Sequence, residues 1–554
     1  MNGSGWDMSR IVQNQEKIVG TGTCRTARAG TADLVRVVVD LTRCQGYGQC
    51  VFLAPEVFRM REESLLYDLA PSDQQRDHVL RAAAACPVQA IHLDWTAMRP
   101  VPDFKPGGST YQGRIVIVGG SLAGARAVGR LRREGFTGPL TVISEEEGEP
   151  YDRPPLSKQV LTGQVAAGHT VFPRLIEVDV EWLSGTPATG LDIEAKKVLL
   201  ADGREIPFDR VLLATGTRAR PWHDPAEAAL AGVHTLRSAQ DAAELRKALE
   251  AGPKRVLILG AGFTGSEIAS VCRELDLPVT VVERGPAPLA SALGGVIGDV
   301  AAALQRAHGV DLRCDTTVTS LEGDADGRFR RARLSDGSTV EADVAVVALG
   351  SVRNVEWLEG SGLAAGVWGV TCDAGCRAVD LNGLVLDDVF VAGDIARFPH
   401  PLYQYQFMTL EHWGNAVAQA EIAAHNMISD QAHRWPHLAV PVFWSSQFGV
   451  NIKSVGVPTF ADQVAVTQGS TADHRFVAAY GYQGRITAAV TFDQGMWLEH
   501  YQRLIEQAAP FPSANARPAR VPEKLSAATE ATVVVTGHDP AERRVSLLPG
   551  GRTS

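Results

Sequence analysis

From Gly113 onward, short runs of β-branched residues alternate with longer stretches of helical periodicity. This alternation predicts a parallel α/β architecture, because helices connect the strands of a parallel sheet and cover its faces. After Arg434 the pattern changes to short strands at 441–449 and 489–492 and then a helix, which indicates an α+β C-terminal region. A separate β-branched run at 35–40 predicts a strand of a small unit that precedes the α/β part.

Two buried strands each run into a glycine-rich turn that opens a helix. In a G-x-G-x-x-G turn, backbone N–H groups meet a pyrophosphate at the helix N-terminus. The pattern positions are Gly119, Ser121 and Gly124 in the first turn, and Gly260, Gly262 and Gly265 in the second. Glu145 and Glu283 end the strand that follows each turn, where an acid can bind a ribose hydroxyl. A single turn of this kind is equally consistent with a tight strand–helix connection that binds no ligand. Two such turns, each followed by an acid at the right distance, predict that the chain binds one flavin dinucleotide and one nicotinamide dinucleotide.

Three cysteines near the N-terminus have the spacing of an iron–sulfur site. Cys44 and Cys50 flank a glycine-rich loop, and Cys86 precedes a proline. Thiolates are the ligands of such clusters, and Tyr47 stands where a further loop cysteine would be. Three thiolates fit a [3Fe–4S] cluster better than a [4Fe–4S] cluster. The alternative is three reduced core cysteines, which is the reading we favour for the others: Cys24, Cys272, Cys314, Cys372 and Cys376.

Composition excludes several classes of function. A chain of 554 residues predicts several domains. The formal charge of −10 argues against general nucleic-acid binding, which needs a basic face. No apolar run has the length of a membrane span, and the N-terminus shows no apolar signal segment. We therefore expect a cytoplasmic protein without nucleic-acid or membrane partners.

Further motifs carry two family resemblances. The unit at 34–98, with its strand at 35–40 and the run Pro55–Phe58, resembles the three-cysteine ferredoxins that serve bacterial cytochromes P450. The region from Arg114 to Gln507 resembles the FAD-dependent ferredoxin reductases of P450 and dioxygenase systems. Its motifs are Tyr151–Lys158, Ala214–Gly216, Val389–Asp394, Glu411–Ala416 and, at the start of the C-terminal domain, Phe443–Gln447.

The reductase resemblance implies a role for several residues. Asp394 is expected to bind the ribityl or pyrophosphate part of FAD, with Arg153 and Lys158 beside the isoalloxazine. Glu267 is expected to pair with Lys158 near flavin N5, and Trp413 to lie close to the flavin and the nicotinamide. Each of these residues also has an alternative role that involves no cofactor. Lys158 and Glu267 would form a surface ion pair, Trp413 would fill a core position, and Asp394 would cap the N-terminus of a helix.

The choice of nicotinamide nucleotide depends on the second unit. Glu283 accepts hydrogen bonds from a ribose 2′-hydroxyl and repels a 2′-phosphate, which favours NADH. Arg284 follows directly and is compatible with NADPH.

The expected fold is an α/β reductase with two Rossmann-like domains and an α+β C-terminal domain, preceded by a small α+β ferredoxin domain. The predicted boundaries are an arm at 1–33, the ferredoxin domain at 34–98, a linker at 99–112, an FAD domain at 113–228 and 345–433, an NAD(P)H domain at 229–344, a C-terminal domain at 434–511 and a tail at 512–554.

The function that this order predicts is a self-sufficient fusion. Electrons would pass from NAD(P)H through FAD and the cluster to an external acceptor, for which a cytochrome P450 or a similar haem or oxygenase protein is favoured. One alternative is an oxidoreductase whose flavin acts directly on a small organic substrate. Another is a redox sensor that binds NADH without rapid turnover.

Overall fold

The computed structural model describes residues 37–41, 43–44, 48–61, 64–69, 71–86, 90–93, 111–172, 179–511, 533–536 and 544–547. The predicted N-terminal arm and most of the predicted linker lie outside these residues. So does most of the predicted tail, in which the structure describes only strands β33 (Val533–Thr536) and β34 (Arg544–Leu547), paired antiparallel. The composition of the tail did not predict these two strands.

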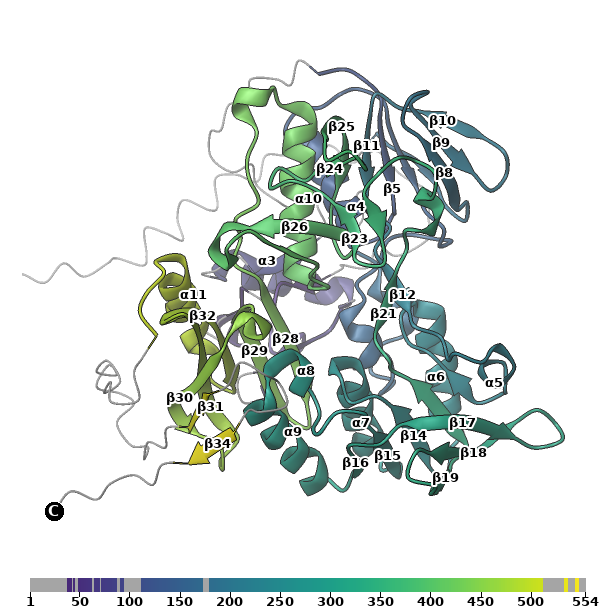
Figure 1. Cartoon of the computed structure of the whole chain (residues 1–554), viewed down its shortest axis with the longest axis vertical. Coiled ribbons are helices and arrows are strands. Elements are labelled where there is room, and N and C mark those ends of the chain that lie inside the picture. Colours follow the sequence, from purple (N-terminus) through teal and green to yellow (C-terminus); the bar gives the residue numbers. More distant parts are fainter. Residues whose placement is uncertain are drawn as a thin grey trace, which may run out of the picture. The chain divides into compact units, whose positions relative to one another are not determined.

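The first dinucleotide unit is built on a six-stranded sheet (Figure 1). Its strands, in sheet order, are β24 (Arg377–Val379), β25 (Val385–Val391), β11 (Arg210–Leu213), β5 (Ile115–Val118), β6 (Leu140–Ile143) and β7 (Glu181–Leu183). All neighbours pair in parallel except β24 with β25. Helix α4 (Leu122–Arg133) follows β5, and it shares one apolar core with α10 (Trp413–Ile428).

The second unit has a five-stranded, wholly parallel sheet. Its order is β13 (Val233–His234), β20 (Val344–Val347), β14 (Val256–Leu259), β15 (Val279–Val282) and β16 (Asp311–Arg313). The helices of this unit are α6 (Ala239–Glu250), α7 (Phe263–Glu274), α8 (Ala290–Leu293) and α9 (Gly295–Ala307). Helix α7 follows β14 directly, so both units have the strand–turn–helix order that the glycine patterns predict.

Smaller elements complete the two units. They are β8 (Ala188–Asp192), β9 (Lys197–Leu200), β10 (Glu205–Pro207), β12 (Thr217–Ala219), α5 (Pro225–Ala228), β17 (Val318–Gly323), β18 (Phe329–Leu334), β19 (Thr339–Glu341), β21 (Ser351–Arg353), β22 (Ala365–Gly366), β23 (Gly369–Thr371), β26 (Ala396–His400) and β27 (Gln406–Met408).

The C-terminal domain is an antiparallel five-stranded sheet with one helix against it. Its sheet order is β28 (Val442–Gln447), β29 (Val450–Gly456), β32 (Arg485–Phe492), β31 (Arg475–Tyr482) and β30 (Gln463–Ser470), and the helix is α11 (Leu498–Glu506). One face of this sheet joins the core of the second dinucleotide unit: Ile452 and Phe476 belong to the same apolar cluster as Ile258 and Ile268. The two parts are therefore packed as one body.

The N-terminal unit, which we call the cysteine module, comprises residues 37–93. Strand β1 (Val37–Val39) pairs antiparallel with β4 (Ile91–Leu93), and β2 (Phe58–Arg61) with β3 (Ser64–Tyr67). Two helices, α2 (Gln49–Leu53) and α3 (Arg76–Ala85), complete it. The module has an apolar core of its own, which includes Phe58, Val79 and Ile91.

Candidate functional site

A cavity of about 560 Å³ opens at the carboxyl ends of the central strands of the first unit. The edge where parallel strands end is the usual ligand site of open α/β sheets. The turn after β5, the segment after β11, the first turn of α10 and the start of β28 all contribute to its wall. The predicted residues that line it are Ser121, Arg153, Lys158, Glu267, Asp394 and Trp413.

The first glycine turn is shaped for close approach of the backbone. Gly119 has φ +115°, and a Cβ there would lie 2.2 Å from the carbonyl oxygen of Ala214. A Cβ on Gly124 would lie 2.0 Å from the carbonyl oxygen of Gly119. Ser121, by contrast, has φ −85° at the N-cap of α4, a backbone conformation that any residue adopts, so serine is tolerated at this position. The turn fits a pyrophosphate at a helix N-terminus.

Glu145, the acid predicted for the first ribose, is exposed and does not line the cavity. The adjacent Glu146 makes the contacts instead, because it accepts hydrogen bonds from the Tyr151 hydroxyl and from the Arg153 guanidinium. Arg153 also donates to the carbonyl oxygen of Arg237 (2.7 Å). The acid that is tied to the cavity wall is thus one residue beyond the predicted one.

Asp394 lies in the cavity wall and is held by two groups. Arg237 Nη2 lies 2.8 Å from Asp394 Oδ2, and the Thr217 hydroxyl donates to the same oxygen at 3.3 Å. The segment after it continues into β26, so no helix begins at Asp394 and the N-cap alternative is wrong. Arg237 was not predicted, because it comes from the second unit and lies 157 residues from Asp394 in the sequence.

Lys158 and Glu267 form an ion pair inside the protein. Lys158 Nζ lies 2.7 Å from Glu267 Oε2, and the Glu267 side chain is only 8% exposed. The hydroxyls of Ser157 and Ser445 donate to the two Glu267 oxygens, at 2.5 and 2.6 Å. The surface-pair alternative is therefore wrong. A buried pair of this kind is held by its hydrogen bonds as well as by charge.

Trp413 is the first residue of α10 and lines the cavity rather than filling a core. Its indole N–H donates to Asp152 Oδ1 (2.9 Å), the Arg126 guanidinium lies 5.6 Å from its ring centre, and Trp444 packs edge-on against it. Burial raises the pKa of Asp152 to about 6. The neighbouring His412 also lines the cavity, and its buried Nδ1 has no hydrogen-bond partner among the described residues. Asp152 and His412 lie within the motifs Tyr151–Lys158 and Glu411–Ala416, but the sequence predicted no role for either of them.

At the second glycine turn, the acid that follows the next strand, Glu283, binds backbone N–H groups of the same unit. A Cβ on Gly265 would lie 2.0 Å from the carbonyl oxygen of Gly260, as in the first turn, whereas a Cβ on Gly262 would meet no atom within 4 Å. Glu283 accepts from the backbone N–H of Ala261 and that of Gly285, both at 2.7 Å. A carboxylate has further lone pairs, so a ribose hydroxyl can still donate to it.

The three predicted cluster cysteines pack against one apolar core in the cysteine module. Burial raises the pKa of the Cys50 thiol to about 11, with contributions from the nearby thiols of Cys44 and Cys86. No three His, Cys, Asp or Glu side chains of the described part are arranged to hold a single metal ion. The thiolates of a cluster bind different iron atoms, so they need not converge on one point. Among the remaining cysteines that the structure describes, Cys272, Cys372 and Cys376 are buried and Cys314 is half-buried.

The module meets the C-terminal domain at the first of these cysteines. Lys453 Nζ, on β29, donates to the carbonyl oxygen of Cys44 at 2.9 Å. Lys453 was not predicted, because 409 residues separate it from Cys44 in the sequence.

Two dinucleotide turns on parallel sheets and a cavity between them define an oxidoreductase with two nucleotide sites. Comparison with family models agrees. The pyridine nucleotide-disulphide oxidoreductase model matches residues 113–420, the reductase C-terminal model matches 442–524, and a model for the 4Fe-4S single cluster domain of ferredoxin I matches 39–93. The chain belongs to the pyridine nucleotide-disulphide oxidoreductase family.

Individual relatives indicate which kind of oxidoreductase this chain resembles. The chain is 35% identical over 351 residues to the ferredoxin–NAD(+) reductase component of the p-cumate 2,3-dioxygenase system of Pseudomonas putida, covering 62% of this chain and 81% of that protein. It is 28% identical over 417 residues to putidaredoxin reductase of the same organism, covering 72% and 92%. The crystal structure of the covalent putidaredoxin reductase–putidaredoxin complex matches with a TM-score of 0.67 and 27% identity, over 72% of this chain and 94% of that one.

These findings confirm the predicted fold class and that the chain is an oxidoreductase of the ferredoxin–NAD(P)+ reductase class. The family implies FAD and NAD(P)H, and the N-terminal match implies an iron–sulfur cluster. The cavity fits the flavin nucleotide, since the first turn excludes any side chain at Gly119 and Gly124. In the part of the chain that the structure describes, no helix is long and apolar enough to cross a membrane.

Proposed function

We propose that this chain carries electrons from NAD(P)H through FAD and its own iron–sulfur cluster to an external acceptor. The observation that carries the proposal is that two cavities have residues of their walls in common. Lys158, Glu267 and Trp444 line the flavin cavity, and the same three residues line a second cavity whose wall includes Cys44 of the cysteine module. A cysteine that we propose as a cluster ligand therefore lines the same cavity as residues that we propose to border the flavin.

The number of electrons that each cofactor transfers at a time explains why the chain would need both a flavin and a cluster. A nicotinamide gives up two electrons together as a hydride, a cluster takes one at a time, and a flavin handles both. The protein supplies position. The first turn and the Asp394–Arg237 pair would hold the flavin nucleotide, and Trp413 and the Lys158–Glu267 pair would border its reactive ring. The turn at Gly260–Gly265 and Glu283 would hold the nicotinamide nucleotide, with NADH preferred.

We propose a [3Fe–4S] cluster on Cys44, Cys50 and Cys86. The support is the count of thiolates in the loop, where Tyr47 replaces a further cysteine. Low-temperature EPR of the oxidised protein should show the S = 1/2 signal of a three-iron cluster. A silent oxidised state with about four irons per chain would instead indicate [4Fe–4S].

We propose a cytochrome P450 as the acceptor, with the predicted 99–112 segment tethering the module. The support is the cysteine pattern of the module together with relatives such as putidaredoxin reductase and rhodocoxin reductase from Rhodococcus erythropolis. Several other relatives are named as components of dioxygenase systems. Reduction assays with a P450 and with a Rieske-type dioxygenase as alternative acceptors separate the two classes.

The variant Cys86→Ser tests the direction of electron flow. It should lose most cytochrome c reduction and keep most ferricyanide reduction, because ferricyanide can take electrons directly at the flavin. Lys158→Ala, in contrast, should slow both reactions. Unchanged cytochrome c and P450 reduction by Cys86→Ser would show that the cluster is not the exit route, and would favour direct action of the flavin on a small substrate or a sensor role.

A further inference from the structure

The motif Phe443–Gln447 begins the C-terminal domain, and the structure shows what its polar side chains contact. It makes up most of strand β28, which lies against helix α7 of the second dinucleotide unit. Successive side chains of a strand point to opposite faces. Along β28, Ser445 and Gln447 are buried, whereas Trp444 and Ser446 are half-buried. The two buried polar side chains therefore share one face of the strand, and this is the face that meets α7.

Two contacts attach the ends of this strand to α7. At one end the Phe443 ring packs edge-on against the ring of Phe263, the first residue of the helix, with ring centres 4.7 Å apart. At the other end the backbone N–H of Phe448 donates to the Ser270 hydroxyl at 2.7 Å. The middle of the strand is thereby held beside the middle of the helix, where Glu267 lies.

The hydrogen bond between Ser445 and Glu267 has a fixed direction. Gln447 Nε2 lies 2.9 Å from Ser445 Oγ, which in turn lies 2.6 Å from Glu267 Oε1. An amide nitrogen can only donate, so the Ser445 oxygen accepts from Gln447. A hydroxyl has one proton, and Ser445 therefore donates it to the carboxylate. Ser445 is fully buried, so solvent cannot replace either partner.

The Glu267 carboxylate is held at both of its oxygens. Oε2 pairs with Lys158 Nζ at 2.7 Å and accepts from the Ser157 hydroxyl at 2.5 Å, and Oε1 accepts from Ser445. Lys158 and Glu267 line the flavin cavity, whereas Ser445 lines neither this cavity nor the one beside Cys44. Ser445 can therefore influence a ligand in the flavin cavity only through Glu267.

We propose that Ser445 is a positioning residue for hydride transfer, which the C-terminal domain supplies to the nucleotide sites. The inference rests on the proposed function, in which the Lys158–Glu267 pair borders the reactive ring of the flavin. The ammonium of a lysine sits on a flexible stem, so Glu267 fixes its place and Ser445 fixes the carboxylate. Without the hydroxyl, Oε1 is a buried acceptor that has lost its donor. Small displacements beside reacting atoms slow a reaction strongly.

Ser445→Ala tests this role, because it removes the hydroxyl and little volume. The assay is anaerobic stopped-flow absorbance of the full chain, loaded with FAD and cluster. Flavin reduction at saturating NADH should be about tenfold slower than in wild type, the effect of losing one hydrogen bond to a charged group. The FAD content and the dissociation constant of NADH should stay within about twofold of wild type, because Ser445 lines neither cavity.

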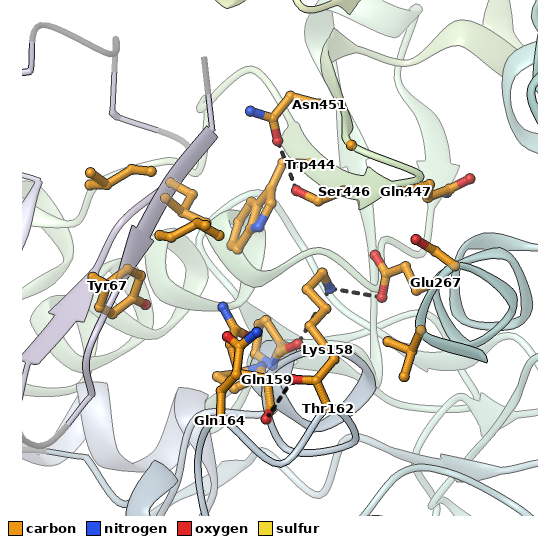
Figure 2. A pocket seen from close by; sticks show the side chains of 18 of the residues that line it. Tyr67, Lys158, Gln159, Thr162, Gln164, Glu267, Trp444, Ser446, Gln447 and Asn451 are labelled. Atoms are coloured by element: carbon orange, nitrogen blue, oxygen red, sulfur yellow. Dashed lines mark hydrogen bonds and ion pairs between the residues drawn. The ribbon is translucent and has the colours of Figure 1, made fainter. Parts of the chain in front are cut away.

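Ser446→Ala is the matched control on the same strand. Figure 2 shows the Ser446 hydroxyl bound to Asn451, while Lys158 reaches Glu267 on its own side of the space. The Ser446 hydroxyl donates to Asn451 Oδ1 at 2.7 Å, so its removal leaves the donors of Glu267 in place. Flavin reduction in this variant should keep the wild-type rate.

A double-mutant cycle separates positioning from a general structural defect. If Ser445 acts through Glu267, adding Ser445→Ala to Glu267→Ala should change the rate of flavin reduction by less than about twofold, since the shared partner is already gone. A structural defect would multiply the two losses. Crystal structures add a readout without turnover: the Glu267 carboxylate should be displaced in Ser445→Ala and unchanged in Ser446→Ala.

The outcomes distinguish this role from the proposed function. Flavin reduction at the wild-type rate by a folded Ser445→Ala, an equal loss in both backgrounds of the cycle, or an undisplaced carboxylate overturns the positioning role and leaves the proposed function intact. Failure of NADH to reduce the flavin of the wild-type chain overturns both.

Discussion

The two glycine turns share a sequence pattern and differ in what surrounds them. The first faces an open cavity whose polar groups include His412 Nδ1, without a partner among the described residues. The second is occupied by Glu283, which binds two backbone N–H groups of its own unit. The two turns therefore differ in whether the acid that follows them is already engaged by backbone N–H groups. This difference bears on our proposal that the first turn holds the flavin nucleotide and the second the nicotinamide nucleotide.

The largest effect is expected from adding one methyl group at the equivalent position of each turn. In Gly124→Ala and in Gly265→Ala the new Cβ meets a backbone oxygen at 2.0 Å, and overpacking of this kind costs about 1–3 kcal/mol. Gly124→Ala should purify with little FAD. Gly265→Ala should keep its FAD and lose reduction by NADH. Flavin absorbance and anaerobic titration with NADH measure the two outcomes, and full FAD content in Gly124→Ala would mean that the first turn does not hold the flavin.

The second effect concerns Asp152, an acid in the wall of the cavity at the first turn. Burial raises the pKa of its carboxyl group to about 6. Between about pH 4 and 6 the unfolded state releases this proton while the folded state keeps it, so stability falls as the pH rises and the loss persists above pH 6. Asp152→Asn removes this term and should gain up to about 3 kcal/mol over wild type across that interval. Urea midpoints at several pH values test it. A constant difference between the two proteins would contradict the assignment.

A smaller effect is expected at the second turn. Glu283→Ala frees the amides of Ala261 and Gly285 and removes a charge that repels a 2′-phosphate. The ratio of kcat/KM for NADH to that for NADPH should fall by about tenfold, equivalent to about 1.4 kcal/mol. Steady-state kinetics with both donors measure it, and a wild-type preference for NADPH would remove the basis of the prediction.

The smallest effect should come from Glu145, the exposed counterpart of Glu283. Glu145→Ala should leave FAD affinity within about twofold of wild type, because Glu145 is exposed and does not line the cavity. Glu146→Ala is the matched comparison, since it removes the contacts to Tyr151 and Arg153. Equilibrium FAD binding to the apoprotein distinguishes them, and equal loss in both variants would restore Glu145 as a ligand.

The sequence predicted the parts of the molecule that depend on local pattern. Strand, turn and helix follow one another within a few residues, so both nucleotide turns and the C-terminal sheet could be recognised. The Lys158–Glu267 pair was predicted through a family resemblance, and the structure shows its burial. Residues that meet across long sequence separations carried no local signal. Arg237 reaches Asp394 from the other unit, and Lys453 reaches Cys44 from the far end of the chain.

Glu145 illustrates a different limit. The motif places an acid at the end of the second strand, and three consecutive glutamates, Glu145, Glu146 and Glu147, follow that strand. Only the path of the chain after β6 decides which one turns toward Arg153. These glutamates lie in a bend beyond the end of β6, where side chains have no regular alternation, so no spacing rule resolves which of them reaches Arg153.

The shared core of the C-terminal sheet and the second dinucleotide unit constrains how this protein can be re-engineered. Ile452 and Phe476 lose their apolar neighbours if the chain is cut before β28, because those neighbours include Ile258 and Ile268. The cysteine module has an apolar core of its own, and its described contacts with the C-terminal domain include the hydrogen bond from Lys453 to Cys44. An exchange that redirects the electrons to a new acceptor should therefore replace residues up to about 98 and keep 113–511 as a single inherited block.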